Sequence, residues 1–234
     1  MDTSQQPKER PILFSAPMVR AILEGRKTVT RRPVKGFQIP TEDTSIPEGE
    51  RHRWSATAQR DPRYGFCVFG ATEAECAREL EEFAPCPYGR RGERLWVRET
   101  TEADEDYSDV VVLSRYAADG APVVYAGCND PEYNGTVANW DYSRLSRPSI
   151  HMPRWACRIL LEITDVRVER LQDISRADIR AEGLQCPPEL TSDDVSPNYR
   201  DWYPAAWREL WESTGGDWDA NPWAWVVEFK RVTQ

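Results

Sequence analysis

The sequence is short of basic residues, of histidine and of long hydrophobic runs, and each shortage excludes a class of protein. Lys and Arg number 30 against 39 Asp and Glu, so the net charge is -9. General nucleic-acid binders carry a basic surface, and any contact with nucleic acid is therefore expected to be local. No apolar run approaches the length of about 18 residues that crosses a bilayer, so we expect no membrane contact.

The first residues lack the apolar stretch of a secretory signal, which favours a cytoplasmic protein. In such a protein the six cysteines are not expected to form disulfides. His52 and His151 are the two histidines that could complete a metal site. Cys67, Cys76 and Cys86 could bind zinc with His52, but their spacing fits no standard zinc knuckle or ribbon. We therefore predict no metal and no cofactor.

Apolar residues make up 40% of the chain, which is enough for a sizeable core. The longest strand pattern covers residues 155–171, where every second residue from Cys157 to Ile163 is apolar. The alternation then moves by one position to Val166 and Val168, which predicts a bulge or bend just before Val166. Further strands are expected at residues 12–14, 26–33, 64–69, 92–99, 110–113, 123–126 and 223–232.

Helix signals are clearest around Ser175, which can cap a short helix that Gly183 ends. A similar pattern places a helix between Ser15 and Gly25, and another is expected over residues 72–83. A later helix carries Tyr203, Trp207, Leu210 and Trp211 on one face. These elements predict a mixed α+β fold with mostly antiparallel strands and short helices, arranged most simply as a small, partly closed β-barrel.

The segment from Gly25 to Arg32 contains four basic side chains and two hydroxyl-bearing residues in an otherwise acidic chain. Charge of the unexpected sign where a helix passes into a strand suggests a nearby anion or polar substrate. The alternative from composition alone is a solvated edge strand that its charges protect from aggregation.

The pattern Gly25-x-Lys27-x-x-Thr30-x-Arg32 resembles the signature of ASCH domains, which belong to the PUA-like superfamily. The run from Ser149 to Ala156 is similar to ASCH proteins of bacteriophages and prophages. The resemblance implies a single PUA-like domain over residues 1–234. Its core would comprise residues 11–33, 92–99 and 148–232, and residues 34–91 and 100–147 would be insertions.

The form with Thr30, where ASCH domains usually carry Glu, resembles small bacterial N4-acetylcytidine amidohydrolases. That resemblance implies Thr30 as the nucleophile, Lys27 as its base or activator and Glu182 as the group that orients Lys27 or relays a proton. It also assigns substrate contacts to Gly25, Arg26 and Arg32. Arg32 would face a phosphate or support the barrel, and solvated positions are the alternative for Arg26 and Arg31.

Two geometrical conditions apply to this site. Lys27 and Thr30 are three residues apart and point to opposite faces of a regular strand, so they converge only if the chain still turns at Lys27. Glu182 is expected at a helix C-terminus, where a carboxylate opposes the helix dipole. Such a local violation is typical of working sites, and an ordinary exposed Glu is the alternative.

The resemblance implies three alternative functions. The first is metal-free hydrolysis of the acyl amide of a modified cytidine, the second is non-catalytic binding of RNA or modified DNA, and the third is RNA cleavage. The expected partner is accordingly a modified nucleoside or RNA. Trp207, Trp211 and Trp225 lie at core spacing, whereas Tyr142 and Trp218 are candidates for lining a pocket.

Overall fold

The computed structural model describes residues 7–58, 66–84, 86–105, 111–125, 137–188 and 197–232, with the side chains of residues 197–201 excepted. The chain divides into two compact units. Unit 1 comprises Met1–Gly25, Gly92–Glu162 and Lys230–Gln234, and unit 2 comprises Arg26–Arg91 and Ile163–Phe229. Two long strands, β10 (Leu160–Arg170) and β11 (Trp223–Val232), run through both units.

Unit 1 is built on β1 (Glu9–Leu13), which pairs in parallel with β6 (Arg94–Arg98). The start of β10 pairs antiparallel with β6 on its other side. A second sheet places β7 (Thr101–Asp104) between β8 (Leu113–Tyr116) and β9 (Ser146–Arg147). The described helical segments of unit 1 are α1 (Ala16–Leu23) and two 3₁₀ turns, Ser149–His151 and Arg154–Ala156.

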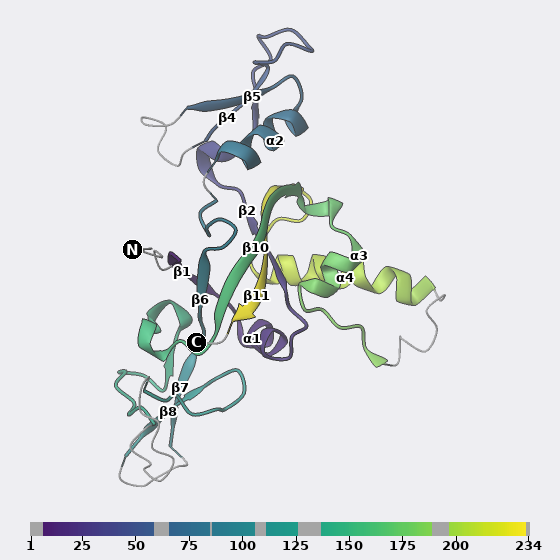
Figure 1. Ribbon diagram of the computed structural model, residues 1–234. Helices are drawn as coiled ribbons and strands as arrows, with labels where there is room; N and C mark the ends of the chain where they lie inside the picture. The colour runs from purple at the N-terminus through teal and green to yellow at the C-terminus, as the bar shows by residue number, and fades with distance from the viewer. Residues whose placement is uncertain are drawn as a thin grey trace. The chain divides into compact units, whose positions relative to one another are not determined.

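Unit 2 contains β2 (Val29–Pro33), which pairs antiparallel with β11. An antiparallel sheet of β3 (Thr41–Glu42), β4 (Trp54–Thr57) and β5 (Cys67–Gly70) carries α2 (Glu73–Phe83) (Figure 1). The remaining helices are α3 (Arg176–Ala181) and α4 (Pro197–Ser213), and 3₁₀ turns cover Gly36–Gln38 and Leu171–Asp173.

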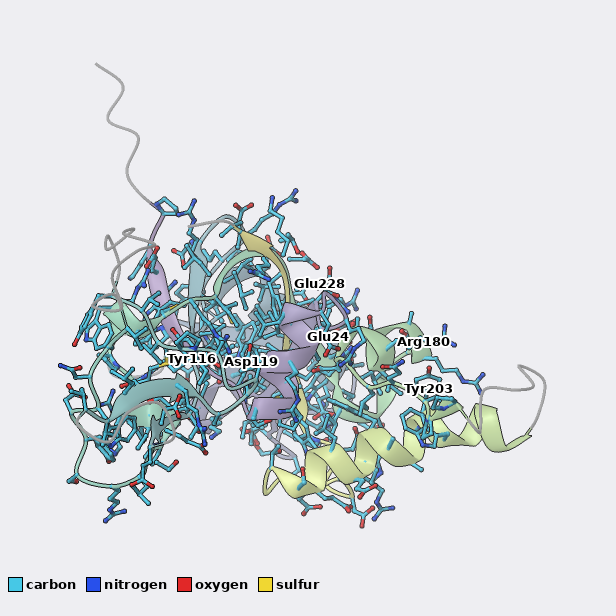
Figure 2. All side chains as sticks on the ribbon, turned by 90° about the horizontal axis from the view of Figure 1, so that it is seen from below. Glu24, Tyr116, Asp119, Arg180, Tyr203 and Glu228 are labelled. Atoms are coloured by element: carbon cyan, nitrogen blue, oxygen red, sulfur yellow. The ribbon has the colours of Figure 1, made fainter. Side chains whose placement is uncertain are left out.

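The core between α3 and α4 explains the aromatic spacing of the last helix. Tyr203, Trp207 and Trp211 are buried there with Ile179, and Arg180 of α3 lies over the Tyr203 ring at 5.0 Å (Figure 2). The predicted core positions of Trp207, Trp211 and Trp225 are confirmed. Trp218, which was expected to be free for a pocket, packs partly buried against this cluster.

The mixed α+β class with mostly antiparallel strands is confirmed, and the described strands form open sheets without a closed barrel. The β10 strand begins later than predicted, because Pro153 starts a 3₁₀ turn over Arg154–Ala156. The alternation of buried residues along β10 changes phase as predicted, since Ile163 and Val168, which are five positions apart, are both buried and Asp165 between them is exposed. The expectation of short helices was wrong for α4, which has 17 residues.

Both insertions contain more strands than predicted. The strand and the helix expected at residues 64–69 and 72–83 correspond to β5 and α2, but β3 and β4 were missed. In the second insertion β7 was missed, and β8 starts at Leu113, where the predicted strand ends. Residue 110 of the first predicted run and residue 126 of the second lie outside the described residues. No described helix combines the length and apolar character of a membrane span.

Candidate functional site

The candidate site begins at the turn between α1 and β2. Gly25 has a φ of +75°, and its N–H donates to the carbonyl of Ile22 at 3.1 Å. A Cβ atom at Gly25 would meet no atom within 4 Å. Glycine is therefore favoured here by the left-handed backbone conformation, and not by close contact with a neighbouring atom. The chain enters unit 2 at the next residue, Arg26, whose Nη1 donates to the carbonyl of Gly183 at 2.5 Å.

Lys27 is buried and directly contacts Glu182. Its Nζ donates to Glu182 Oε2 at 2.6 Å and to the Glu182 carbonyl at 2.9 Å. The two residues also form an isolated antiparallel bridge, and the N–H of Thr28 donates to the carbonyl of Ala181 at 2.8 Å. The structure thus joins two residues that are 155 positions apart in the chain.

Burial governs the charge state of Lys27. The loss of hydration lowers the pKa of the Lys27 ammonium below its ordinary value of 10.5, and the neighbouring Arg32 and Arg31 guanidinium groups act in the same direction. Attraction and a hydrogen bond from Glu182 oppose this shift. The net lowering brings Lys27 nearer to the neutral form that accepts a proton.

The short helix α3 holds Glu182 in position. The Ser175 side chain caps the helix by accepting from the N–H of Asp178 at 3.1 Å, as the sequence predicts. Glu182 is the C-cap residue, and Gly183 follows with a φ of +95°. A carboxylate here opposes the helix dipole, so its burial depends on nearby cations.

Arg31 is the second cation of the site, and the suggestion that it is solvated was wrong. Its side chain has no exposed surface, and its Nη2 donates to Asp178 Oδ2 at 2.8 Å and to Glu169 Oε2 at 3.0 Å. Its Nη1 lies 3.5 Å from Glu182 Oε1. Asp178 and Glu182 are four residues apart on α3, so their like charges share one face and require a cation. That spacing is the signal that could have identified Arg31.

Arg167 extends the ionic network on β10. It donates to Asp178 Oδ2 at 3.2 Å and also pairs with Glu169 and Glu228. Three cations and four carboxylates therefore interlock around α3 and the strands, namely Lys27, Arg31, Arg167, Asp178, Glu169, Glu182 and Glu228.

Thr30 is buried on β2, where it lies opposite Val227 in the register with β11. Neighbouring side chains of a strand point to opposite faces, so the Thr30 hydroxyl and the Arg31 guanidinium lie on opposite faces of β2. Lys27 and Arg31 both contact the Glu182 carboxylate. The Lys27 side chain therefore lies on the side of the Arg31 guanidinium and not on the side of the Thr30 hydroxyl. Lys27 precedes the start of β2, and the role of Thr30 stays a prediction.

Arg32 lies opposite Trp225 in the same register. Trp225 lines a pocket of about 270 Å³ together with Arg90, Arg91 and Asp165. Its indole N–H is buried without a hydrogen-bond acceptor among the described residues. The pocket is slightly smaller than the about 300–1,000 Å³ of sites for drug-sized ligands.

The described cysteines form no disulfides, and no group of three or more His, Cys, Asp or Glu in the described part of the chain could hold a metal ion. His52 packs edge-on against Phe69, with ring centroids 4.7 Å apart. Comparison of the chain with protein-family models, with curated proteins and with solved structures gave no match.

Proposed function

We propose that the chain is a hydrolase that cleaves the acyl amide of a modified cytidine of the N4-acetylcytidine type, in a PUA-like fold of the ASCH type. The observation that supports this function most directly is the buried contact between Lys27 and Glu182 at 2.6 Å, with the pKa of Lys27 lowered by burial. A lysine in such a setting gives up its proton more readily than an ordinary lysine, which suits proton transfer.

The proposed reaction assigns proton transfer to this pair. Neutral Lys27 takes the proton from the attacking hydroxyl or water and returns it to the leaving amine of the cytidine, while Glu182 holds the ammonium that forms between the two steps. If a hydroxyl of the protein attacks, cytidine leaves first and the acetyl group remains as an ester on the attacking oxygen; a water molecule that Lys27 deprotonates then hydrolyses this ester to acetate and restores the hydroxyl. If water attacks directly, cytidine and acetate form without an ester intermediate. The motif resemblance makes Thr30 the attacking group, which requires its hydroxyl to reach the substrate from its own face of β2.

The direct test incubates the pure protein with N4-acetylcytidine and measures cytidine and acetate by mass spectrometry. Turnover is expected in the wild type and should be lost in Lys27→Met and Glu182→Gln variants that remain folded by circular dichroism. Full activity of both variants would exclude the assignment.

The attacking group is identified by a second measurement. If Thr30 attacks, an acetylated protein accumulates in rapid-quench samples analysed by intact mass, and Thr30→Ala loses activity whereas Thr30→Ser retains part of it. Turnover in Thr30→Ala without any adduct would assign the attack to water.

Non-catalytic binding of RNA or modified DNA is the second candidate. It is favoured by the pairing within the ionic network, where Lys27, Arg31 and Glu182 are all engaged with one another. Such a network stabilises one arrangement of α3 against β2. Saturable binding of a modified nucleoside or oligonucleotide with no product after prolonged incubation would select this candidate.

A further inference from the structure

A second feature lies in unit 1, in the segment from Tyr142 to Arg158. This segment contains four arginines and one histidine and no acidic residue, in a chain whose net charge is -9. It includes the 3₁₀ turns Ser149–His151 and Arg154–Ala156. Carboxylates from outside the segment balance much of this charge in the fold, since Asp141 pairs with Arg147, Glu9 with Arg154, and Glu99 and Asp119 with Arg158.

One side of the segment is anchored in the core of unit 1. Met152, Ala156 and Cys157 are buried, and the Tyr116 hydroxyl donates to the Ala156 carbonyl at 2.8 Å. Arg158 lies over the Tyr116 ring at 3.8 Å.

Arg158 also ties the end of the segment to two carboxylates. It bonds Glu99 at 2.8 Å and 2.9 Å and Asp119 at 2.8 Å and 3.0 Å. Tyr116 and Asp119, which Arg158 joins, are labelled in Figure 2. These contacts hold the backbone of the segment, so its outward side chains are displayed on a fixed frame.

The other side of the segment exposes aromatic rings that already form stacked pairs. The Trp155 ring stacks on Tyr125 with centroids 4.9 Å apart, and the two residues are 38% and 40% exposed. Tyr142 stacks on the exposed His151 with centroids 6.1 Å apart. We name these four residues, Tyr125, Tyr142, His151 and Trp155, the aromatic surface.

Arginines accompany the aromatic surface. Arg147 is buried and lies over the Tyr142 ring at 5.2 Å, which holds that ring in place. Arg144 and Arg154 are exposed, and Arg154 pairs with Glu9 at 2.6 Å. Exposed ion pairs contribute only about 0.2–1 kcal/mol, so Arg154 can exchange Glu9 for another anion at little cost.

We propose that the aromatic surface binds single-stranded nucleic acid. Bases stack on the exposed faces of the Tyr125 and Trp155 rings, and the phosphates contact Arg144 and Arg154. Stacking on aromatic rings combined with cationic side chains is how proteins hold single strands, and the exposed Arg144 and Arg154 supply the cations of this surface. The inference is independent of the proposed function, because the aromatic surface belongs to unit 1 and Lys27 and Glu182 belong to unit 2.

Binding is tested by fluorescence anisotropy with fluorescein-tagged single strands of RNA and DNA, about 12 nucleotides long, the upper part of the site-size range for one single-strand binding fold. Trp155→Ala and Tyr125→Ala are each expected to raise the Kd by about 5- to 150-fold, the range that corresponds to one lost stacking contact. Trp155→Phe should restore most of the affinity. Arg144→Ala should weaken binding to all sequences and lower the slope of log Kd against log salt by about 1.

Matched controls are Phe37→Ala and Phe66→Ala, which remove aromatic side chains that are 60% and 54% exposed in unit 2. Both should leave the Kd unchanged. Absence of strand binding by the wild type at low salt, or an unchanged Kd in Trp155→Ala, overturns the proposal. A wild-type dimer in analytical ultracentrifugation that Trp155→Ala converts to a monomer would show a protein interface instead and would equally overturn it.

Hydrolysis of free N4-acetylcytidine separates this inference from the proposed function. Trp155→Ala should weaken strand binding and leave kcat/KM for the free nucleoside unchanged. Lys27→Met should abolish this hydrolysis and leave strand binding intact. Loss of activity and loss of binding therefore have separate signatures.

Discussion

At the scale of single residues, the pair of Lys27 and Glu182 has the largest energetic consequence. Both side chains are almost fully buried, and Glu182 has a second cation in Arg31 at 3.5 Å. Burying two charges costs several kcal/mol each, which only close pairing offsets. Removing one partner therefore leaves an incompletely compensated charge.

We expect Lys27→Met to lower the free energy of unfolding by about 3–5 kcal/mol, the usual effect of breaking a buried ion pair. Removing both charges in Lys27→Met/Glu182→Leu should recover much of this loss. Urea denaturation followed by circular dichroism measures the changes. The control is Arg208→Ala, which breaks an exposed pair with Glu212 on α4 and should lower the free energy of unfolding much less than Lys27→Met. A similarly small effect of Lys27→Met would contradict the burial of the pair.

The lowered pKa of Lys27 predicts a pH dependence with a definite sign. The folded protein releases this proton at a lower pH than the unfolded chain, whose lysines titrate near 10.5. Between these pH values the unfolded chain binds more protons, so the contribution of Lys27 to the free energy of unfolding increases with pH. In the proposed reaction the neutral lysine is the base, and kcat/KM should rise along a limb with its midpoint below the ordinary lysine pKa of 10.5.

This limb is measured as a pH profile of N4-acetylcytidine hydrolysis. Lys27→Arg keeps the positive charge but cannot titrate in this range, and it should lose the limb together with the activity. A wild-type midpoint at or above the ordinary lysine pKa of 10.5 would show that Lys27 is not the titrating base.

At the scale of secondary-structure elements, α3 decides where the carboxylates of the site lie. A stretch of nine residues contains the N-cap Ser175, the carboxylates of Asp178 and Glu182, and the following Gly183. The helix has only six residues and gains little stability from its own hydrogen bonds. Its position therefore depends on the cap, on Ile179 in the core and on the ion pairs with Arg31 and Lys27.

Loss of the cap should consequently affect both stability and activity. Ser175→Ala is expected to lower the free energy of unfolding by about 1 kcal/mol and to reduce hydrolysis through displacement of Glu182. Thr72→Ala is the matched control, because Thr72 caps α2 in the same way by accepting from the N–H of Glu75 at 3.2 Å. It should cost similar stability, measured by urea denaturation, and leave hydrolysis unchanged. Equal activity losses in both variants would contradict a specific role of α3.

At the scale of the whole molecule, the described thiols fall into an exposed and a buried class. Cys67 is exposed, whereas Cys76, Cys86, Cys157 and Cys186 are buried. Burial, with nearby Glu79 and Glu73, raises the pKa of Cys76 to about 12. Since the thiolate is the reactive form, the native fold should protect Cys76 from alkylation.

Brief treatment of the native protein with iodoacetamide, followed by peptide mass mapping, should therefore modify Cys67 and spare the four buried cysteines. The same treatment in urea should modify all five. Rapid native labelling of Cys76 would contradict the packing of α2 against β5, and equal labelling of Cys157 would contradict the core of unit 1.

Local sequence signals by themselves determined several elements of this protein. The cap at Ser175, the burial of the α4 tryptophans and the bounds of β11 depend on hydrogen bonds and apolar periodicity within a few residues. Such features are visible in the order of the residues because their partners are close in the chain. The same holds for Gly25, whose positive φ ends the turn after α1.

The tertiary structure alone decided which charges meet. Arg31 looks like a solvated strand residue in the sequence, but it lies buried against Asp178 and Glu169, which are 147 and 138 positions away. Thr30 was grouped with Lys27 by the motif, yet the alternation of β2 separates it from the face that Arg31 shares with Glu182. Long-range pairing of charges depends on strand register and on where α3 packs, and neither can be read from residues that are neighbours in the chain.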